Sequence, residues 1–516
     1  MSNATIRVAT SLLLALCAAL ACTVQAQTPG SLDTTPFPGF ASGAGKIANL
    51  AIGSGADHVR AVAVQPDGRI VLAGDCADAT DTDFCIARLN TDGSLDQSFD
   101  GPNGDGNGKF LLSFSASFDN AVALALQPDG KIVVFGSCIS GGSSYFCLTR
   151  LLQDGSLDAS FSGPGGNGNG KFVLANGAAT DYASAMALQP DGRILLAGSC
   201  YNGVNFDFCA ARLNPNGSFD STFIGPGGSA VGRFLVSFTA DDDYLSAVAL
   251  QADGKIVLAG TCRNGSASDF CVARLNTDGT LDASFDGPSG SGNGKFLLAI
   301  GAASDYEPVI LLQPDSKIVL AGYCQVGSDF DFCAARLNSN GSLDPLFSGP
   351  SGTGNGKIVL AVGTSFDQLY AAALQPDGKI VLAGECSGAA NYDFCVVRLN
   401  VDGSLDASFD GPGGSANGKF LLPIGASHDG VRAMALQPDG KIVLAGSCSN
   451  GTDYDFCVAR LFGGPFAYKS CSMDIDGDGK FLGTTDALIM TRIALGFTGT
   501  AALNGITFAP TATRTT

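Results

Sequence analysis

Hydrophobic residues occur along this chain in short runs separated by turn residues, and the whole pattern repeats. The clearest copy is QPDGKIVLAGSCSNGTDYDFCVARL, residues 437–461. Its first glutamine recurs every 62 residues, at Gln65, Gln127, Gln189, Gln251, Gln313, Gln375 and Gln437. A fixed period of this length indicates a repeat architecture in which each repeat is one packing unit.

The pattern inside each repeat predicts four short strands. A Pro-Asp-Gly turn separates two apolar runs, residues 433–436 and 442–445, and predicts a β-hairpin. The second run is apolar on both faces, which is typical of a strand buried between two layers. The side chains of the third strand, residues 455–461, alternate between two faces. The fourth strand, seen at residues 419–424 of the preceding copy, follows a turn-rich connector, and four short strands per repeat are typical of a propeller blade.

The two ends of the array decide the number of blades. Seven copies of the first three strands are present, but a fourth strand follows only six of them, beginning at Lys109, Lys171, Arg233, Lys295, Lys357 and Lys419. Residues 45–53, GKIANLAIG, read as the missing fourth strand, which we expect beside the third strand of the last repeat. The sequence therefore predicts an all-β fold, a seven-bladed β-propeller of four-stranded blades closed by an N-terminal strand.

The segments outside the array indicate export. Residues 1–26 contain one charge, Arg7, an apolar run at 8–21 and a small-x-small site at 24–26, which is typical of a secretory signal peptide cleaved before Gln27. A lipoprotein attached through Cys22 is the alternative. Residues 27–44 are expected to be a linker, 45–466 the propeller and 467–516 a separate tail. No later segment approaches the about 18 to 20 apolar residues of a membrane-spanning helix, so we expect a periplasmic, extracellular or cell-surface location.

The acidic balance restricts the possible partners. The net charge is −19, which argues against nucleic acid and anionic lipid and favours cations or cationic surfaces. We expect a monomer.

The cysteines indicate a set of disulfides within blades. Two of the 17 lie in residues 1–26, and fourteen others form seven pairs separated by eight residues. The pairs are Cys76 with Cys85, Cys138 with Cys147, Cys200 with Cys209, Cys262 with Cys271, Cys324 with Cys333, Cys386 with Cys395 and Cys448 with Cys457. Each joins the end of a second strand to the start of a third, where antiparallel neighbours come close enough for a disulfide. Zinc is the weaker alternative, because the chain has only two histidines.

The tail contains a candidate calcium loop, DIDGDGKFLGTTD. Asp474, Asp476 and Asp478 stand at loop positions 1, 3 and 5, and Lys480 would offer its backbone carbonyl at position 7. Position 12 is Thr485, and the carboxylate follows one residue later, at Asp486. We therefore predict bound calcium as a cofactor.

Two resemblances follow from these motifs. The QPDGKIVLAG and FCVARL units resemble the delta-60 repeat family, bacterial β-propellers of largely unknown function, over about residues 45–461. This resemblance implies the fold and supplies no catalytic residues. The tail is similar to a dockerin calcium loop with its following helix. Dockerins usually hold two such loops and dock onto a cohesin, and the single loop here argues against a cohesin-like partner.

Comparison between the repeats points to one face as a binding surface. The loops between second and third strands differ in every blade, whereas the hairpin turns and connectors are nearly uniform. These variable loops share a face with the loops that lead into each first strand. We expect a protein or glycan ligand on this face; the alternative is drift in unconstrained loops.

One aspartate recurs in the loop before every first strand. The seven are Asp57, Asp119, Asp181, Asp243, Asp305, Asp367 and Asp429. They would form a crown of carboxylates at the channel mouth for a cation or a polyol, or each would cap its own turn through backbone N–H groups. An arginine also recurs on the third strand. We expect it to pair with a carboxylate such as the Asp67, Asp129 and Asp191 series, or with loop carbonyls.

Enzymatic signals are weak. The two histidines, His58 and His428, occupy non-equivalent positions with no nucleophile motif beside them, and we expect no catalytic residue. The leading hypothesis is an exported, non-enzymatic binding or scaffolding module of unknown ligand. The alternatives are a carbohydrate-active enzyme or accessory protein and a structural envelope protein. Blade-specific acids and aromatic residues clustered on the variable face would favour the carbohydrate-active alternative, and even decoration would favour the leading one.

Overall fold

The computed structural model describes residues 28–464, except 36–38, 103, 105, 165–168, 177–179, 227–231, 291, 351–353, 389, 415–416 and 426. The predicted signal peptide and the tail, with Asp474, Asp476, Asp478, Lys480 and Asp486, lie outside the described residues. Within the described part, no helix has the length and hydrophobicity to span a membrane.

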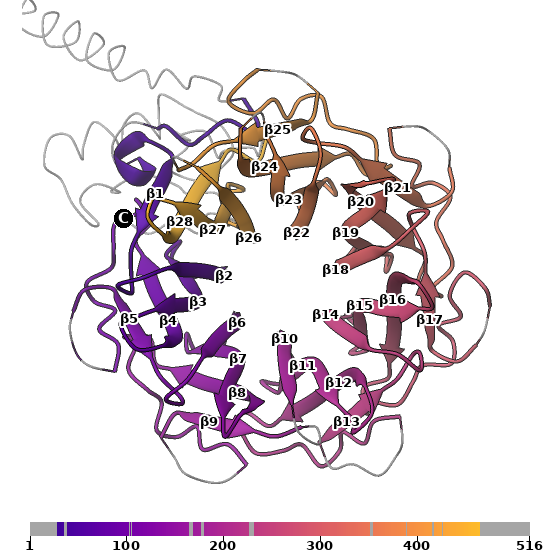
Figure 1. The fold of residues 1–516 in the computed structure, drawn as a ribbon, viewed down its shortest axis with the longest axis horizontal. Coiled ribbons are helices and arrows are strands. Elements are labelled where there is room, and N and C mark those ends of the chain that lie inside the picture. Colours follow the sequence, from indigo (N-terminus) through magenta and orange to yellow (C-terminus); the bar gives the residue numbers. More distant parts are fainter. Residues whose placement is uncertain are drawn as a thin grey trace, which may run out of the picture. The chain divides into compact units, whose positions relative to one another are not determined.

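The described strands form seven antiparallel four-stranded sheets arranged as a ring (Figure 1). The first three blades contain β2 (Asp57–Val64), β3 (Ile70–Ala77), β4 (Thr82–Leu89) and β5 (Lys109–Leu112); β6 (Asp119–Leu126), β7 (Ile132–Ser140), β8 (Ser143–Leu151) and β9 (Lys171–Leu174); and β10 (Asp181–Leu188), β11 (Ile194–Tyr201), β12 (Phe206–Leu213) and β13 (Arg233–Val236). The next three contain β14 (Asp243–Leu250), β15 (Ile256–Asn264), β16 (Ala267–Leu275) and β17 (Lys295–Leu298); β18 (Asp305–Leu312), β19 (Ile318–Val326), β20 (Asp329–Leu337) and β21 (Lys357–Leu360); and β22 (Asp367–Leu374), β23 (Ile380–Ser387), β24 (Tyr392–Leu399) and β25 (Lys419–Leu422). The seventh contains β26 (Asp429–Leu436), β27 (Ile442–Ser449), β28 (Tyr454–Leu461) and β1 (Lys46–Leu50). The predicted seven-bladed propeller is confirmed, and the first strand of each blade lies nearest the channel.

The ring closes as the sequence predicts. Strand β1 pairs antiparallel with β28, with Lys46 opposite Ala459. Residues 30–35, assigned above to a linker, also belong to the seventh blade, because Leu32 bridges to Leu461 as Leu89 bridges to Leu95 in the first blade. The linker prediction therefore needs correction here. The short 3-10 helix η1 (Phe40–Gly43) follows.

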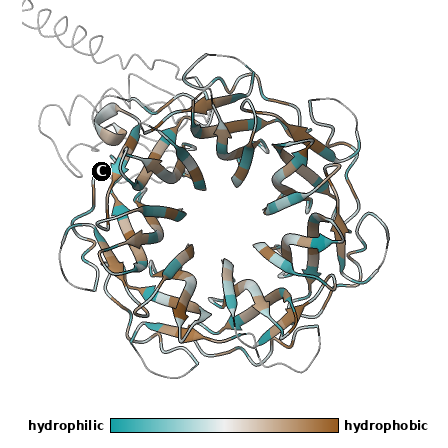
Figure 2. Ribbon diagram, viewed as in Figure 1, coloured by the Kyte–Doolittle hydropathy of each residue, from teal (hydrophilic) through white to brown (hydrophobic). Residues whose placement is uncertain are grey.

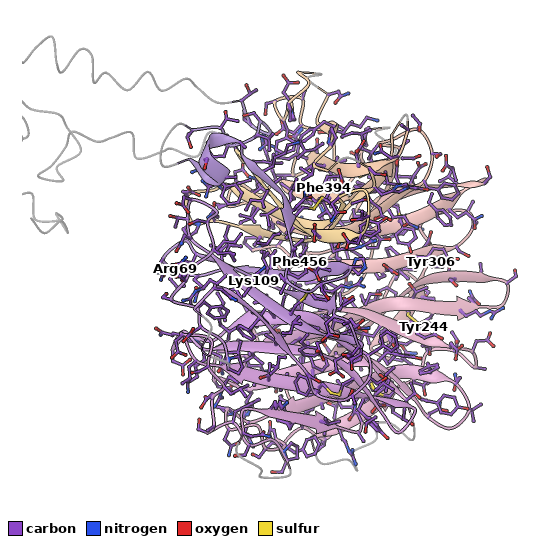
Figure 3. All side chains as sticks on the ribbon, turned by 60° about the vertical axis from the view of Figure 1, so that its left-hand side comes forward. Arg69, Lys109, Tyr244, Tyr306, Phe394 and Phe456 are labelled. Carbon is purple, nitrogen blue, oxygen red and sulfur yellow. A yellow bond between two sulfur atoms is a disulfide. The ribbon has the colours of Figure 1, made fainter. Side chains whose placement is uncertain are left out.

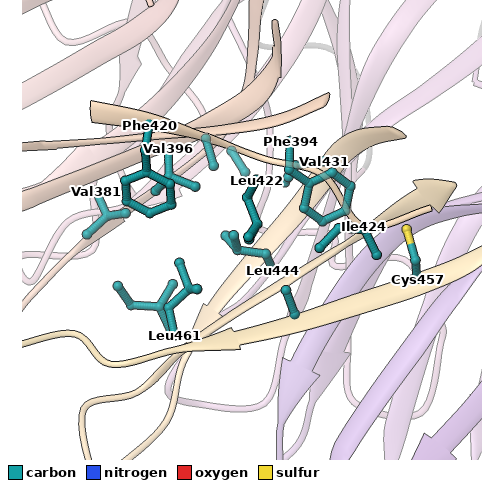
Figure 4. Close-up of a cluster of buried hydrophobic side chains, with 14 of the residues drawn as sticks. Val381, Phe394, Val396, Phe420, Leu422, Ile424, Val431, Leu444, Cys457 and Leu461 are labelled. Carbon is teal, nitrogen blue, oxygen red and sulfur yellow. The ribbon is translucent and has the colours of Figure 1, made fainter. Parts of the chain in front are cut away.

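The hydrophobic core lies between the blades. Seven clusters of buried side chains each join two neighbouring blades. Between the sixth and seventh blades, Val381 and Phe394 pack with Leu444 and Leu461 (Figure 4). Hydrophobic residues therefore follow the strands of every blade, whereas the innermost strands also carry hydrophilic ones (Figure 2). Since every blade buries both faces against neighbours, a blade depends on the intact ring.

The seven predicted disulfides are confirmed. Each links the second strand to the third strand of the same blade, with Cα atoms 5.7 to 5.9 Å apart. The bonds join Cys76 to Cys85, Cys138 to Cys147, Cys200 to Cys209, Cys262 to Cys271, Cys324 to Cys333, Cys386 to Cys395 and Cys448 to Cys457. They fix the base of the variable loops, because these loops begin and end at the paired strands.

One detail of the disulfide prediction needs correction. The second cysteine of each pair lies inside the third strand and not at its start, because that strand begins earlier than expected. These second cysteines are Cys85, Cys147, Cys209, Cys271, Cys333, Cys395 and Cys457. The bond is consequently diagonal across the ladder. In the first blade, the residue opposite Cys76 is Asp83, and the residue opposite Cys85 is Gly74.

The recurring arginine joins each blade to the next. Arg88 Nε lies 2.7 Å from Asp96 Oδ2 in the connector of its own blade, and Nη1 donates to the carbonyl of Gln153 in the following blade. The guanidinium also lies 4.4 Å from the ring centroid of Phe99. The expected partner was wrong, because Asp67 pairs instead with its neighbour Arg69. The expected bond to a loop carbonyl is present.

Candidate functional site

The recurring aspartates do not line the channel mouth. Asp57 is fully buried, and its Oδ2 accepts hydrogen bonds from the backbone N–H groups of Ile52, at 2.6 Å, and Gly53, at 3.1 Å. The same bond to the residue five positions earlier recurs for Asp119, Asp181, Asp243, Asp305, Asp367 and Asp429. Of the two alternatives, the structure shows the loop caps and not the crown, because each carboxylate is turned into its own loop.

The variable loops and the loops that enter the first strands share one face, as predicted. In the first blade, the N–H of Ser54 donates to the carbonyl of Ala77, at the base of the variable loop, over 3.1 Å. We call this the variable face. Tyr244 and Tyr306 lie toward this side of the ring, and Arg69, in a hairpin turn, lies on the other (Figure 3).

Aromatic side chains gather on the variable face in two groups. In the third and fourth blades, Phe206 lies between Tyr182 and Tyr244, with ring centroids 5.3 and 5.6 Å away. In the fifth and sixth blades, Phe330 lies 5.9 Å from Tyr306 and 5.6 Å from Phe366. Tyr182, Tyr244 and Phe366 are all exposed. These rings form the aromatic arc, comprising Tyr182, Phe206, Tyr244, Tyr306, Phe330 and Phe366.

A cavity of about 930 Å³ opens beside the arc. Tyr244 and Tyr306 line it, together with the charged side chains of Asp242, Arg263 and Glu307. Serine hydroxyls from the third, fourth and fifth blades complete the wall, at Ser184, Ser246, Ser266, Ser268 and Ser304. The cavity is therefore aromatic at its rim and densely supplied with hydrogen-bonding groups.

Glu307 reaches the cavity because the repeat is broken in the fifth blade. Strand β18 reads DYEPVILL where β14 reads DYLSAVAL, so that Glu307 occupies the position of the buried Leu245. In β14 one extra residue interrupts the pairing of the first two strands, but in β18 the interruption runs from Tyr306 to Val309. Pro308 is buried, and Glu307 is exposed with a φ of 51°. Because side chains other than glycine rarely adopt such a φ, this conformation is strained.

The surroundings of Glu307 act on its proton affinity. Although its side chain is accessible from the cavity, the surrounding protein limits the hydration of the Glu307 carboxylate and thereby raises its pKa. The charges of Arg432 and Arg60 lower this pKa, and Glu385 raises it further. Its N–H donates to Thr261 Oγ1 over 2.9 Å. Glu307 is therefore an acid in a restricted space, close to both positive and negative charge.

A second group of charged and aromatic side chains continues from Glu307 around the channel, through the fifth, sixth and seventh blades. Arg432 Nη2 lies 3.0 Å from Glu385 Oε2, and its guanidinium stacks 3.8 Å from the ring centroid of Tyr370. The ring centroids of Tyr370 and Tyr323 lie 6.1 Å apart. Burial raises the pKa of Tyr370 to about 12. We call Glu307, Tyr323, Tyr370, Glu385 and Arg432 the channel cluster.

The channel cluster has no counterpart in the second, third and fourth blades. The position of Arg432 is occupied there by Val122, Ser184 and Ser246. The position of Glu385 is occupied by Ser137, Ser199 and Thr261. The first blade does have a matching pair, Arg60 and Asp75, whose Nε and Oδ1 atoms lie 2.7 Å apart. At these two positions, charged or tyrosine side chains therefore occur in the fifth, sixth, seventh and first blades, and hydroxyls and small side chains occur in the other three.

Reasoning from the sequence did not identify the channel cluster. It correctly located the variable face, but it did not predict whether aromatic and charged residues cluster on that face. The usable signal was the exchange of Leu-Ser for Glu-Pro at residues 307–308, which breaks an otherwise regular strand.

Fold and site together define a disulfide-linked seven-bladed β-propeller with a polar cavity at one mouth of its channel. A family model described as "Domain of unknown function (DUF5122) beta-propeller" matches residues 65–99, 127–161, 189–223, 251–285, 313–347, 375–409 and 437–462. These matches support a repeat β-propeller family. No curated protein matches the chain.

Several solved structures are similar in fold. Chaetomium thermophilum Sqt1, bound to the N-terminus of the ribosomal protein L10, is 14% identical over 80% of this chain and 100% of its own, with a TM-score of 0.41. A PL25 ulvan lyase, a polysaccharide lyase bound to -[GlcA(1-4)Rha3S]-, is 11% identical over 81% of this chain and 96% of its own, with a TM-score of 0.47. Drosophila Plexin A in complex with Semaphorin 1b is 10% identical over 84% of this chain and 88% of its own, with a TM-score of 0.36. At these identities, nothing about a ligand follows.

Proposed function

We propose that this protein is an exported, non-enzymatic binding module that holds a glycan in the cavity beside the aromatic arc. The observation that carries this proposal is the uneven variable face. Two tyrosines of the aromatic arc, Tyr244 and Tyr306, line a cavity of about 930 Å³, and the blade-specific acid Glu307 also lines it. Clustering of blade-specific acids and aromatic residues is the pattern that favours the carbohydrate-directed alternative over an evenly decorated scaffold, and it is the reason why the proposed ligand is a glycan.

The chemistry of the cavity suits a polyhydroxylated ligand. Tyrosine and phenylalanine rings offer flat apolar faces to the C–H surfaces of sugar rings, while tyrosine also hydrogen-bonds through its hydroxyl. Serine hydroxyls and the charged groups of Asp242, Arg263 and Glu307 offer both donors and acceptors to sugar hydroxyls. The cavity is also within the size range of small-ligand sites.

The remaining features fit export. Seven disulfides persist best in an oxidising compartment, so the propeller would act in the periplasm, outside the cell or at its surface. In this proposal the tail carries a calcium ion on Asp474, Asp476 and Asp478, with the Lys480 carbonyl and Asp486 completing the loop.

The test is a screen of labelled oligosaccharides against the mature protein, followed by calorimetric titration of the best ligand. We expect Tyr244→Ala and Glu307→Gln each to weaken binding at least about 10-fold, since each removes a contact of the cavity. Leu346→Ala is the matched control, because Leu346 is an exposed side chain in a connector outside the cavity. Failure of every oligosaccharide to bind, or equal loss in the control, would reject the proposal.

A carbohydrate-active enzyme is the second candidate, and one observation favours it. Glu307 combines a raised pKa, a strained backbone and a position in the cavity, which together are typical of a general acid or base. If the bound oligosaccharide is also cleaved, chromatography will show shorter products. Glu307→Gln would then abolish cleavage while a measurable affinity remains.

A further inference from the structure

A second cavity opens on the variable face, between the second and third blades. It has a volume of about 310 Å³, and the exposed side chains of Phe118 and Tyr182 line it. It shares Val122 and Ala183 with the larger cavity of about 930 Å³, so the two cavities adjoin. Because Tyr182 belongs to the aromatic arc, the smaller cavity lies at one end of this arc.

One position near the start of the third strand explains where both cavities lie. In the third blade this position is Phe206, whose ring lies between Tyr182 and Tyr244 with centroids 5.3 and 5.6 Å away. The counterparts of Phe206 are Ser144 in the second blade and Ser268 in the fourth. Ser144 lines the smaller cavity, and Ser268 lines the larger one. Each cavity therefore lies where a small serine replaces the phenylalanine ring.

The smaller cavity offers hydrogen bonds but no charge. Among the described residues that line it, none is acidic or basic, whereas the larger cavity contains charged side chains of both signs. Ser144 Oγ donates to the carbonyl of Asp181 over 2.9 Å, and Ser137 Oγ accepts the N–H of Ala183 over 2.8 Å. Both hydroxyls are thus held in place, and Ser144 can still accept a hydrogen bond while Ser137 can still donate one.

We propose that the smaller cavity is a second subsite, which binds an uncharged sugar of the same glycan chain that occupies the larger cavity. This inference rests on the proposed function and specifies its ligand as a chain of sugars. A volume of about 310 Å³ lies at the lower end of the range for small-ligand sites, which suits a single sugar unit. The rings of Phe118 and Tyr182 offer apolar faces to that sugar, and the serine hydroxyls bond its hydroxyl groups.

The test is the dependence of affinity on chain length. The probes are size-fractionated oligosaccharides, from the disaccharide upward, prepared from the polysaccharide that binds best to the full-length mature protein. In calorimetric titration, the longest should bind at least about 10-fold more tightly than the disaccharide, because a chain that reaches both subsites adds contacts without a second association step. This difference is the chain-length gain.

The repeat supplies a variant that closes only the second subsite. Ser144→Phe gives the second blade the residue that the third blade carries as Phe206 and the fifth as Phe330, so the fold should accept it. It should remove the chain-length gain and leave the affinity for the disaccharide unchanged. Ser144→Thr is the matched control, because the first blade carries Thr82 at this position, and it should keep the gain.

Two further variants complete the set. Ser268→Phe fills the larger cavity in the same way and should weaken the binding of every oligosaccharide at least about 10-fold, the disaccharide included. Phe118→Ala removes an exposed ring from the smaller cavity and should reduce only the chain-length gain. Because Phe118 is exposed, this variant tests the second subsite even if Ser144→Phe does not fold.

The outcomes distinguish the second subsite from the proposed function. The second subsite is rejected if the longest oligosaccharide binds no more tightly than the disaccharide. It is also rejected if the gain persists in Ser144→Phe with an unchanged melting temperature, or in Phe118→Ala where Ser144→Phe does not fold. In these cases a loss of binding in Ser268→Phe still supports the proposed function. Both proposals fail if no oligosaccharide binds, or if Ser268→Phe binds all of them as the wild type does.

Discussion

At the scale of single residues, identity between blades and variation between blades have different causes. The aspartate that begins each first strand is constant because it accepts the backbone bonds of its own loop. The residue after it is His58, Asn120, Tyr182, Tyr244, Tyr306, Gln368 or Gly430. That position can vary because it takes no part in the cap. Constant residues therefore report local structure, and the changing residues beside them form the surface on which we propose that a ligand binds.

The buried caps predict how stability depends on pH. Burial raises the pKa of Asp57, Asp305 and Asp367 to about 6, above the ordinary value of 3.8, even though the backbone bonds oppose this shift. The folded state then binds more protons than the unfolded state between about pH 4 and pH 6. The contribution of each cap is therefore fully present below pH 3.8 and is lost as pH rises through about 6.

Asp367→Asn isolates one such cap. The amide exchanges an acceptor oxygen for a donor, so the variant should be about 1 to 3 kcal/mol less stable than the wild type at about pH 4. That difference should shrink toward about pH 6.5, because only the wild-type carboxyl loses its proton. Denaturant unfolding of both proteins across this range measures the effect. A difference that stays constant or grows with pH would contradict the raised pKa.

At the scale of elements, β18 and β14 show that one strand position can serve either the core or the site. In β14 the sequence Leu245-Ser246 buries a leucine and keeps the regular bulge. In β18 the pair Glu307-Pro308 buries the proline and turns the acid into the cavity with a positive φ. Compared with the fourth blade, the fifth blade lacks a favourable backbone conformation and a buried leucine. Such a loss of stability is expected where it conflicts with function.

Exchanging the two local sequences tests this conflict. The double variant that combines Glu307→Leu with Pro308→Ser gives β18 the local sequence of β14, so it should relieve the strain and gain about 1 to 3 kcal/mol in the free energy of unfolding. It should also lose at least about 10-fold in glycan affinity, because the cavity loses its acid. Denaturant unfolding and calorimetric titration measure the two effects. A less stable variant, or one that keeps full affinity, would show that Glu307 is held in place for another reason.

Most elements could be predicted from the sequence because their determinants are local. The Pro-Asp-Gly turns, the alternation of residues 455–461 and the cysteine spacing each lie within one blade. The fourth strand of the sixth blade ends at Leu422, two residues before the prediction, because the N–H of Ile424 donates to the cap Asp429 and not to a neighbouring strand. The GSLD motif of residues 30–33 matches the connectors, yet its partner Arg460 is 427 residues away, and only the closed ring brings them together.

The site was less predictable than the fold for a related reason. The channel cluster takes its residues from β18, β19, β22, β23 and β26, which become neighbours only around the channel. Its key member, Glu307, stands at a position that is buried in the other blades. Its direction depends on the backbone that Pro308 requires, and hydrophobic periodicity does not contain that information.

At the scale of the whole molecule, the contacts between blades are regular, whereas the side chains that line the channel differ from blade to blade. Each blade is bound to the next by the same arginine link and the same type of core cluster. The channel cluster lies on the side of the channel formed by the fifth to seventh blades, and the Arg60 and Asp75 pair of the first blade continues it, so one ligand could meet several blades at once. Such a site exists only while the ring is closed, so closure is a condition for binding as well as for stability.

Asp33 is the residue that tests closure. It is fully buried, lies 2.7 Å from Arg460 and 3.3 Å from Lys441, and comes from the N-terminal segment that completes the seventh blade. In the second blade, Asp158 makes the matching contacts with Arg150, at 2.8 Å, and Lys131, at 3.2 Å. Asp33→Ala and Asp158→Ala therefore remove the same ion pair, and each should cost about 3 to 5 kcal/mol by leaving an arginine buried without its partner.

Only the first variant should open the ring. Asp158 lies within a continuous blade, whereas Asp33 holds a terminal segment that also carries β1, the strand that closes the seventh blade. Limited proteolysis at equal residual stability should therefore cleave Asp33→Ala first within residues 28–50, and glycan affinity should fall together with the loss of that segment. Asp158→Ala should keep its N-terminal segment intact under the same conditions. If mass spectrometry shows the same early cleavage sites in both variants, then the N-terminal strand is not what keeps the ring closed.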